Sequence, residues 1–183
     1  MSGREPGPAL VVVGPPGAGK TTIGRLVAAA LGVGFRDTDD DIESAQGKPI
    51  ADIFIDEGEE HFRVLERDAV RAALQSHEGV LALGGGAPVQ PDIAELLCRH
   101  RVAYLQVGLA DAAERVGFNR DRPLLLGNPR AQLRALLAER APRYAAVASF
   151  VIDTHGREPA EIAAEVTAHI AAEEIGATEE VGP

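Results

Sequence analysis

The sequence contains one run of residues with an evident chemistry, GPPGAGKTT at positions 14–22. It fits the pattern G-x-x-x-x-G-K-[ST], in which backbone N–H groups and the N-terminus of a helix form a cradle for phosphate. We expect Lys20 to reach the β- and γ-phosphates of a nucleotide and Thr21 to ligate Mg²⁺. A chance glycine turn is the alternative, but an apolar run precedes the motif and a helical pattern follows it. The motif predicts a nucleoside triphosphate as ligand and leaves the phosphate acceptor open.

Acidic residues form a second candidate group at the end of a predicted strand, where residues 37–41 read DTDDD. Ligands of parallel sheets bind at the carboxyl ends of strands, so we assign Asp37 and Asp39 to function. One carboxylate is expected to point toward Mg²⁺ and the glycine loop, and the other to accept a proton from a hydroxyl substrate or to position it. We assign Asp40 and Asp41 to the favourable interaction of acids with the first turn of a helix.

Three glycines, Gly84, Gly85 and Gly86, end another predicted strand and leave backbone open to a ligand, although a tight turn would explain them as well. Earlier in the chain, Arg63 lies on a helical stripe with the arginines four and eight residues further on. Pairing with neighbouring glutamates explains that stripe equally well. Spacing alone therefore does not single out Arg63.

Arginines are concentrated between residues 115 and 143, where seven stand against two acids. Within this stretch GFNRDRPLLLGNPR breaks the periodicity, and a loop of this length is typical of a lid. Arginines in a lid would neutralise charge on a transferring phosphoryl group while water is excluded. The residues that flank or occupy this loop are Arg115, Arg120 and Arg122. The alternative is a solvated basic surface, to which we assign Arg130, Arg134 and Arg143.

Strands alternate with helices along the chain, which predicts a parallel sheet covered on both faces. We predict strands at 9–13, 35–37, 80–83, 102–107 and 150–153. We predict helices after the glycine loop up to Gly32, and at 39–46, 50–57, 59–76, 92–99, 111–117, 131–140 and 159–174. The expected fold class is α/β, a P-loop three-layer αβα sandwich with a five-stranded parallel sheet.

Composition restricts the class of protein. At 183 residues the chain fits one domain, and its net charge of −10 argues against nucleic acid and anionic membranes as partners. Cys98 is the only cysteine, which excludes a disulfide framework and a multi-cysteine zinc site, and we expect it to be an ordinary buried thiol. No apolar run approaches about 18 residues and no signal-peptide pattern is found, so we expect a cytoplasmic protein.

The glycine motif at this chain length leaves three kinds of protein open: a small-molecule kinase, a nucleoside monophosphate kinase and a GTPase-like switch. A switch normally carries an N-K-x-D segment that reads its base. The only lysines are Lys20 and Lys48, and Lys48 stands in GKP. The switch is therefore disfavoured.

The ordered set of motifs resembles shikimate kinase, of the nucleoside-monophosphate-kinase-like P-loop proteins. The motifs are GPPGAGKTT, DTD followed by IE, GKPIADIF, GEEHFR, LALGGG, NRDRPLL and RAPRY. They cover roughly residues 10–157. The resemblance implies transfer of the γ-phosphate of ATP to the 3-hydroxyl of shikimate, in the route to chorismate and aromatic amino acids. It also implies a monomer with a shikimate-binding region at about 38–65 and a mobile lid at about 117–127.

The resemblance also implies roles for single residues. Thr21 would bind Mg²⁺ with the support of Asp37, and Asp39 would hold or deprotonate the shikimate hydroxyl. Lys20 and Arg122, the lid arginine, would act on the ATP phosphates. The implied shikimate-binding residues are Asp39, Arg63, Gly84, Gly85, Gly86 and Arg140. The implied ATP-binding residues are Gly17, Ala18, Gly19, Lys20, Thr21, Thr22, Arg115, Arg122 and Arg157.

Two alternatives to this function stay open at the level of sequence. One is a related P-loop kinase for another hydroxy acid, such as gluconate, because paired arginines favour a carboxylate-bearing acceptor without identifying its ring. The other is a nucleotide-binding regulator that uses the acidic tail at about 175–183 for an interaction. One departure from the family lies near the base-binding segment, where DTHGRE has Gly156 in place of a polar or basic residue.

Overall fold

The computed structural model describes residues 7–115 and 128–179. Five strands form one sheet in the order β2-β3-β1-β4-β5, and every neighbouring pair is parallel. The strands are β1 Leu10–Val13, β2 Phe35–Asp37, β3 Val80–Ala82, β4 Val102–Gln106 and β5 Phe150–Asp153. The central strand β1 is buried along its whole length, as its uninterrupted apolar run predicts. The predicted fold class is confirmed.

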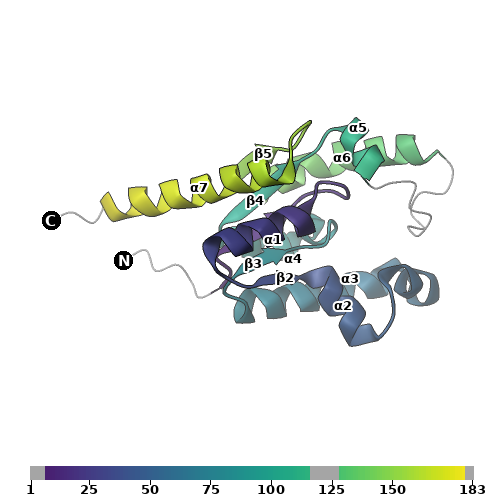
Figure 1. Cartoon of the computed structure of the whole chain (residues 1–183). Coiled ribbons are helices and arrows are strands. Elements are labelled where there is room, and N and C mark those ends of the chain that lie inside the picture. Colours follow the sequence, from purple (N-terminus) through teal and green to yellow (C-terminus); the bar gives the residue numbers. More distant parts are fainter. Residues whose placement is uncertain (1–6, 116–127, 180–183) are drawn as a thin grey trace.

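Helices cover both faces of this sheet (Figure 1). They are α1 Lys20–Leu31, α2 Thr38–Gln46, α3 Ile50–Ser76, the 3₁₀ turn η1 Ala87–Val89, α4 Pro91–Leu97, α5 Leu109–Arg115, α6 Pro129–Val147 and α7 Pro159–Glu179. On one face Leu10 and Val12 of β1 pack with apolar residues of α1 and α7. On the other face Val11 and Val13 pack with apolar residues of α3, α4 and α6. Alternate residues of β1 thus pack into two different cores, one on each face of the sheet. Helices, sheet and helices form a three-layer sandwich.

A third and smaller core joins α2 to the first half of α3 through Ile42, Ile53 and Phe62. The helix α3 is interrupted at Gly58, whose φ of 85° and ψ of 169° lie outside the helical region. This break agrees with the prediction of two helices on either side of that residue. The helical region that follows β2 is therefore a separate packing unit beside the sheet.

Two predicted helix ends are wrong by several residues. The helix α6 does not end at Arg140 but continues to Val147 through Pro142. Proline costs a helix one hydrogen bond, yet buried Tyr144 and Val147 pack into the core beyond it, and this packing outweighs the cost. The acidic tail is also partly helical, because α7 extends to Glu179. None of the helices in the described ranges is long and apolar enough to cross a membrane.

Candidate active site

The glycine loop lies between the carboxyl end of β1 and the start of α1, as predicted. Gly19 is the N-cap of α1 with a φ of 86°, a left-handed conformation that glycine adopts without strain. The ammonium group of Lys20 folds back along the loop and donates to the carbonyl oxygen of Pro15 at 3.1 Å. The helix N-terminus and the lysine therefore lie together around one loop, which is the arrangement that binds phosphate.

Beside this loop, Thr21 and Asp37 are in direct contact. The hydroxyl of Thr21 donates to Asp37 Oδ2 at 2.8 Å, and Asp37 Oδ1 accepts from the backbone N–H of Asp39 at 3.0 Å, which makes Asp37 the N-cap of α2. A hydroxyl and a single carboxylate suit Mg²⁺, which prefers oxygen ligands and keeps several positions for water and nucleotide phosphates. No group of three or more His, Cys, Asp or Glu side chains that could hold a metal ion occurs within the described ranges.

The start of α2 is tied to the end of β3. The backbone N–H of Gly84 donates to the hydroxyl of buried Thr38 at 3.2 Å. A Cβ at Gly84 would lie 2.5 Å from Asp39 Oδ1 and 2.7 Å from Glu66 Oε1. Only glycine lets both carboxylates approach the backbone here, so a close approach, and not merely a tight turn, explains Gly84.

The geometry singles out Arg63 from its stripe. Its guanidinium donates to Glu66 Oε2 at 2.8 Å and to Glu59 Oε1 at 2.9 Å. It also lies directly across the glycine run, because a Cβ at Gly86 would be 1.8 Å from Arg63 Nη1. Arg71 of the same stripe instead pairs with a carboxylate of α4. Arg63 is therefore the arginine that α3 directs to the end of β3.

Glu66 is a site residue that the sequence reasoning missed. Its side chain is only 1% exposed, and Oε2 also accepts from Gln90 Nε2 at 2.9 Å. Burial raises the pKa of Glu66, and the positive charges of Arg63 and Arg140 oppose that rise. Glu66 follows Phe62 by one helical turn on the buried side of α3. A charged residue in the apolar phase of a helix is the signal that could have found it.

A second arginine reaches the glycine run from α6. Arg140 Nη1 donates to the carbonyl oxygen of Gly85 at 3.1 Å, and the hydroxyl of buried Tyr144 donates to the same oxygen at 2.7 Å. Burial raises the pKa of the Tyr144 phenol, which stays a donor. Tyr144 was not predicted from the sequence. Arg63 and Arg140 thus approach one short segment from two different helices.

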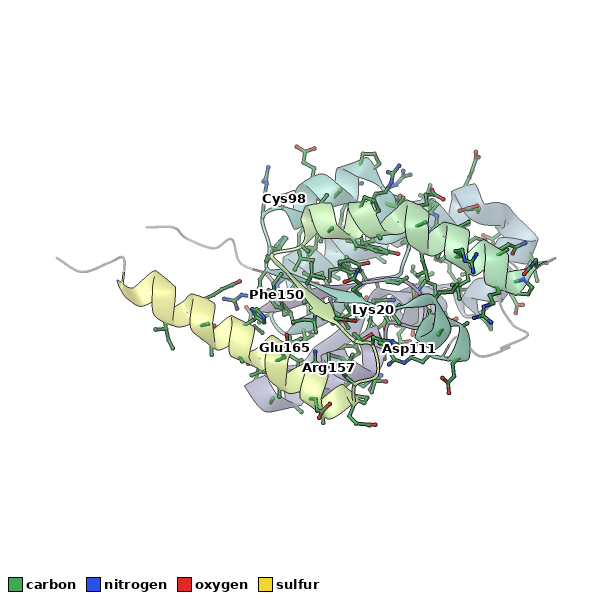
Figure 2. All side chains as sticks on the ribbon, turned by 90° about the horizontal axis from the view of Figure 1, so that it is seen from above. Lys20, Cys98, Asp111, Phe150, Arg157 and Glu165 are labelled. Carbon is green, nitrogen blue, oxygen red and sulfur yellow. The ribbon has the colours of Figure 1, made fainter. Side chains whose placement is uncertain are left out.

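Two of the predicted nucleotide-binding arginines, Arg115 and Arg157, lie on the β5 side of the sheet, and only Arg115 contacts the glycine loop. Arg115 Nη1 donates to the carbonyl oxygen of Gly17 at 3.4 Å and to Thr154 Oγ1 at 3.3 Å. Arg157 instead pairs with Glu165 of α7 at 2.5 Å, as the labelled side chains in Figure 2 show. Arg120, Arg122 and the predicted lid fall outside the described residues.

Three of the remaining predictions concern residues away from this site. Cys98 is exposed, which corrects the expectation of a buried thiol, and Figure 2 shows it well apart from Lys20. It lies just after α4, whose Leu97 fills the core position instead. Asp41 pairs with Arg36 at 2.7 Å and Asp40 lies 3.9 Å from Arg25, so both acids have partners that are not site residues.

Comparisons with known proteins assign the family. A family model described as shikimate kinase matches residues 16–171. The shikimate kinase of Frankia casuarinae is 60% identical over 153 residues, which are 84% of this chain and 68% of that protein. The shikimate kinase of Salinispora arenicola is 57% identical, over 90% of this chain and 99% of that protein.

A solved structure agrees with these matches. The shikimate kinase of Acinetobacter baumannii in complex with shikimate superposes with a TM-score of 0.87 at 37% identity, and the match covers 93% of this chain and 96% of that one. The resemblance drawn from the motifs is thus confirmed over the sheet, the glycine loop and the helical region. The chain belongs to the shikimate kinase family of ATP-dependent phosphotransferases.

Proposed function

We propose how this chain carries out the reaction of its family, transfer of the γ-phosphate of ATP to the 3-hydroxyl of shikimate. The observation that carries the proposal is the approach of Arg63 and Arg140 to one glycine segment beside Asp39. Two guanidinium groups suit a carboxylate, which accepts hydrogen bonds on both oxygens. The nearby aspartate suits a hydroxyl. A hydroxy acid satisfies both requirements.

The order of the sheet separates the two substrates. Most of the residues assigned to the acceptor follow β2 and β3, on one side of β1, and Arg140 reaches the same segment from α6. Those assigned to the nucleotide follow β1, or lie beyond β4 and β5 on the other side. ATP would therefore place its phosphates on the glycine loop and extend its base toward β5. The γ-phosphate would face the acceptor hydroxyl over the ends of β1 and β3.

Asp39 is placed to orient the acceptor hydroxyl. It lies in the first turn of α2, which Asp37 caps, and Gly84 lets its carboxylate reach the backbone at the end of β3. Holding a hydroxyl in line with the phosphoryl group converts a bimolecular encounter into an oriented one, and the carboxylate takes the proton as the bond forms. Most of the rate enhancement in such a transfer comes from positioning and electrostatics.

Thr21 and Asp37 would hold Mg²⁺, for which their hydroxyl and carboxylate are suitable ligands. When bound, Mg²⁺ would neutralise negative charge on the nucleotide phosphates during the transfer. Lys20 contributes a second positive charge from the glycine loop.

The chain is proposed to act as a cytoplasmic monomer. In support, the exposed large apolar residues that the structure describes are dispersed over several elements, including α1, α3, β5 and α7.

Replacing Arg140 by alanine tests the acceptor site. The variant should bind shikimate about 30- to 100-fold more weakly, because it loses one charge-assisted half of a carboxylate clamp, whereas ADP affinity should stay within about twofold. Calorimetric titration with shikimate and with ADP measures both. Arg143→Ala is the matched control, since Arg143 is exposed on the same helix and donates to Val89 instead. Equal weakening of both ligands in Arg140→Ala would contradict the assignment.

A further inference from the structure

A carboxylate outside the site described above connects two segments on the nucleotide side. Asp111 Oδ2 lies 2.9 Å from His155 Nδ1 and accepts from the backbone N–H of Gly156 at 3.2 Å. Because an ionised carboxylate only accepts hydrogen bonds, Nδ1 must be the protonated nitrogen of the ring. Asp111 belongs to α5, and the other two residues lie between β5 and α7. One side chain thus holds a helix against a distant loop.

The loop is shaped for this contact. Gly156 has a φ of 62°, a left-handed conformation, and a Cβ there would meet no atom within 4 Å. The requirement for glycine is therefore conformational and not steric, and the turn that it allows directs the N–H at Asp111. The backbone N–H of His155 is fixed in turn by Asp153 Oδ1 at 3.0 Å. The departure from the family pattern at Gly156 thus has a structural role in this chain.

The same helix carries Arg115 one turn further on. Residues four apart lie on one face of a helix, so the Asp111 contact and the Arg115 contact are made by the same side of α5. Arg115 reaches Thr154 Oγ1 and Thr154 O at 3.3 Å each and Gly17 O at 3.4 Å. Bonds of this length are weak, so the place of the guanidinium depends on α5 staying against the loop.

We propose that Asp111 is a positioning residue for the nucleotide base: it holds α5 on the loop between β5 and α7, and thereby fixes Arg115 and Thr154 beside the glycine loop. The inference rests on the proposed placement of ATP, in which the base extends toward β5. The carboxylate hydrogen bond to Gly156 is the essential part of the contact. The His155 ring is 66% exposed and contributes less, because contacts between exposed side chains are weak.

The rival explanation is a surface contact that only stabilises the fold. The two explanations differ in the ligands that they affect. A contact that positions groups around the base changes the affinity for ligands that carry a base and leaves inorganic polyphosphate unaffected. A contact that only stabilises the fold lowers the melting temperature without distinguishing between these ligands.

Calorimetric titration of Asp111→Ala with ADP, with inorganic tripolyphosphate and with shikimate tests the proposal. We expect the Kd for ADP to rise about tenfold, as for the loss of a hydrogen-bonded charge. The Kd values for tripolyphosphate and for shikimate should stay within about twofold of those of the unaltered protein. Asp111→Asn keeps an acceptor oxygen for Gly156 and should recover most of the ADP affinity. Glu114→Ala is the matched control, because Glu114 is exposed on the same helix.

Two results would overturn the role of Asp111: unchanged ADP affinity in Asp111→Ala, or equal weakening of ADP and tripolyphosphate. Neither result would bear on the proposed function, because that function is tested by titrating the unaltered protein with the same ligands. Failure of the unaltered protein to bind both ADP and shikimate would contradict the proposed function itself.

Discussion

Replacing Asp39 by asparagine is expected to lower kcat by about 10³-fold, within the range for loss of a general base, while the KM for ATP changes little. Asparagine has nearly the same shape but neither the negative charge nor the capacity to accept the hydroxyl proton. The carboxylate lies beside Gly84, on the acceptor side of the sheet. Steady-state kinetics with each substrate varied in turn measures the change.

The neighbouring acid provides the control for this variant. Asp40 has an exposed side chain and lies 3.9 Å from Arg25. Asp40→Asn removes the same charge from the same helical turn and should leave kcat within about twofold, since exposed ion pairs contribute little. Undiminished turnover in Asp39→Asn, or an equal loss in Asp40→Asn, would show that Asp39 has no special part in the reaction.

Lys20→Ala should lower kcat/KM for ATP by about 10²- to 10³-fold, because the phosphoryl group in transfer loses a positioned positive charge. The backbone cradle of α1 remains, so shikimate affinity measured without nucleotide should stay within about twofold. Titration with shikimate and kinetics with ATP separate the two effects.

The chain has one other lysine, which serves as the comparison. Lys48 pairs with Asp56 at 3.1 Å and with Glu57, both in the first part of α3. Lys48→Ala should leave kcat/KM for ATP within about twofold. A comparable loss from both lysine variants would mean that general charge, and not the position of Lys20 at the glycine loop, supports catalysis.

The fold could be predicted from the sequence because its strands, its glycine loop and its helices each have a pattern among neighbouring residues. The apolar run of β1, the glycine motif and the helical pattern of α1 follow one another directly, and the alternation of strands and helices predicts the parallel sheet. The placement of Asp37 and Asp39 at the carboxyl edge of the sheet could also be predicted, since the ends of parallel strands meet at one edge.

Other features depend on contacts between distant segments. Spacing could not separate Arg63 from its stripe, because the distinction comes from Gly86, which meets it only in the folded chain. The end of α6 was misplaced because a local rule for Pro142 was outweighed by core packing. Tyr144 was missed because nothing local distinguishes a phenol that bonds a backbone carbonyl from a core residue.

We propose that the acceptor is a hydroxylated ring acid held by two arginines beside Asp39. The most direct measurement is ADP release from ATP and Mg²⁺ with shikimate, gluconate or nucleoside monophosphates as acceptor, with the phosphorylated product followed alongside. We expect shikimate to support turnover with one product formed per ADP, and the other acceptors to give less than about 1% of that rate, as for a site whose polar groups are left unpaired. Equal or faster turnover with gluconate or a nucleoside monophosphate, or no stimulation by shikimate, would show that the acceptor site is not built for shikimate.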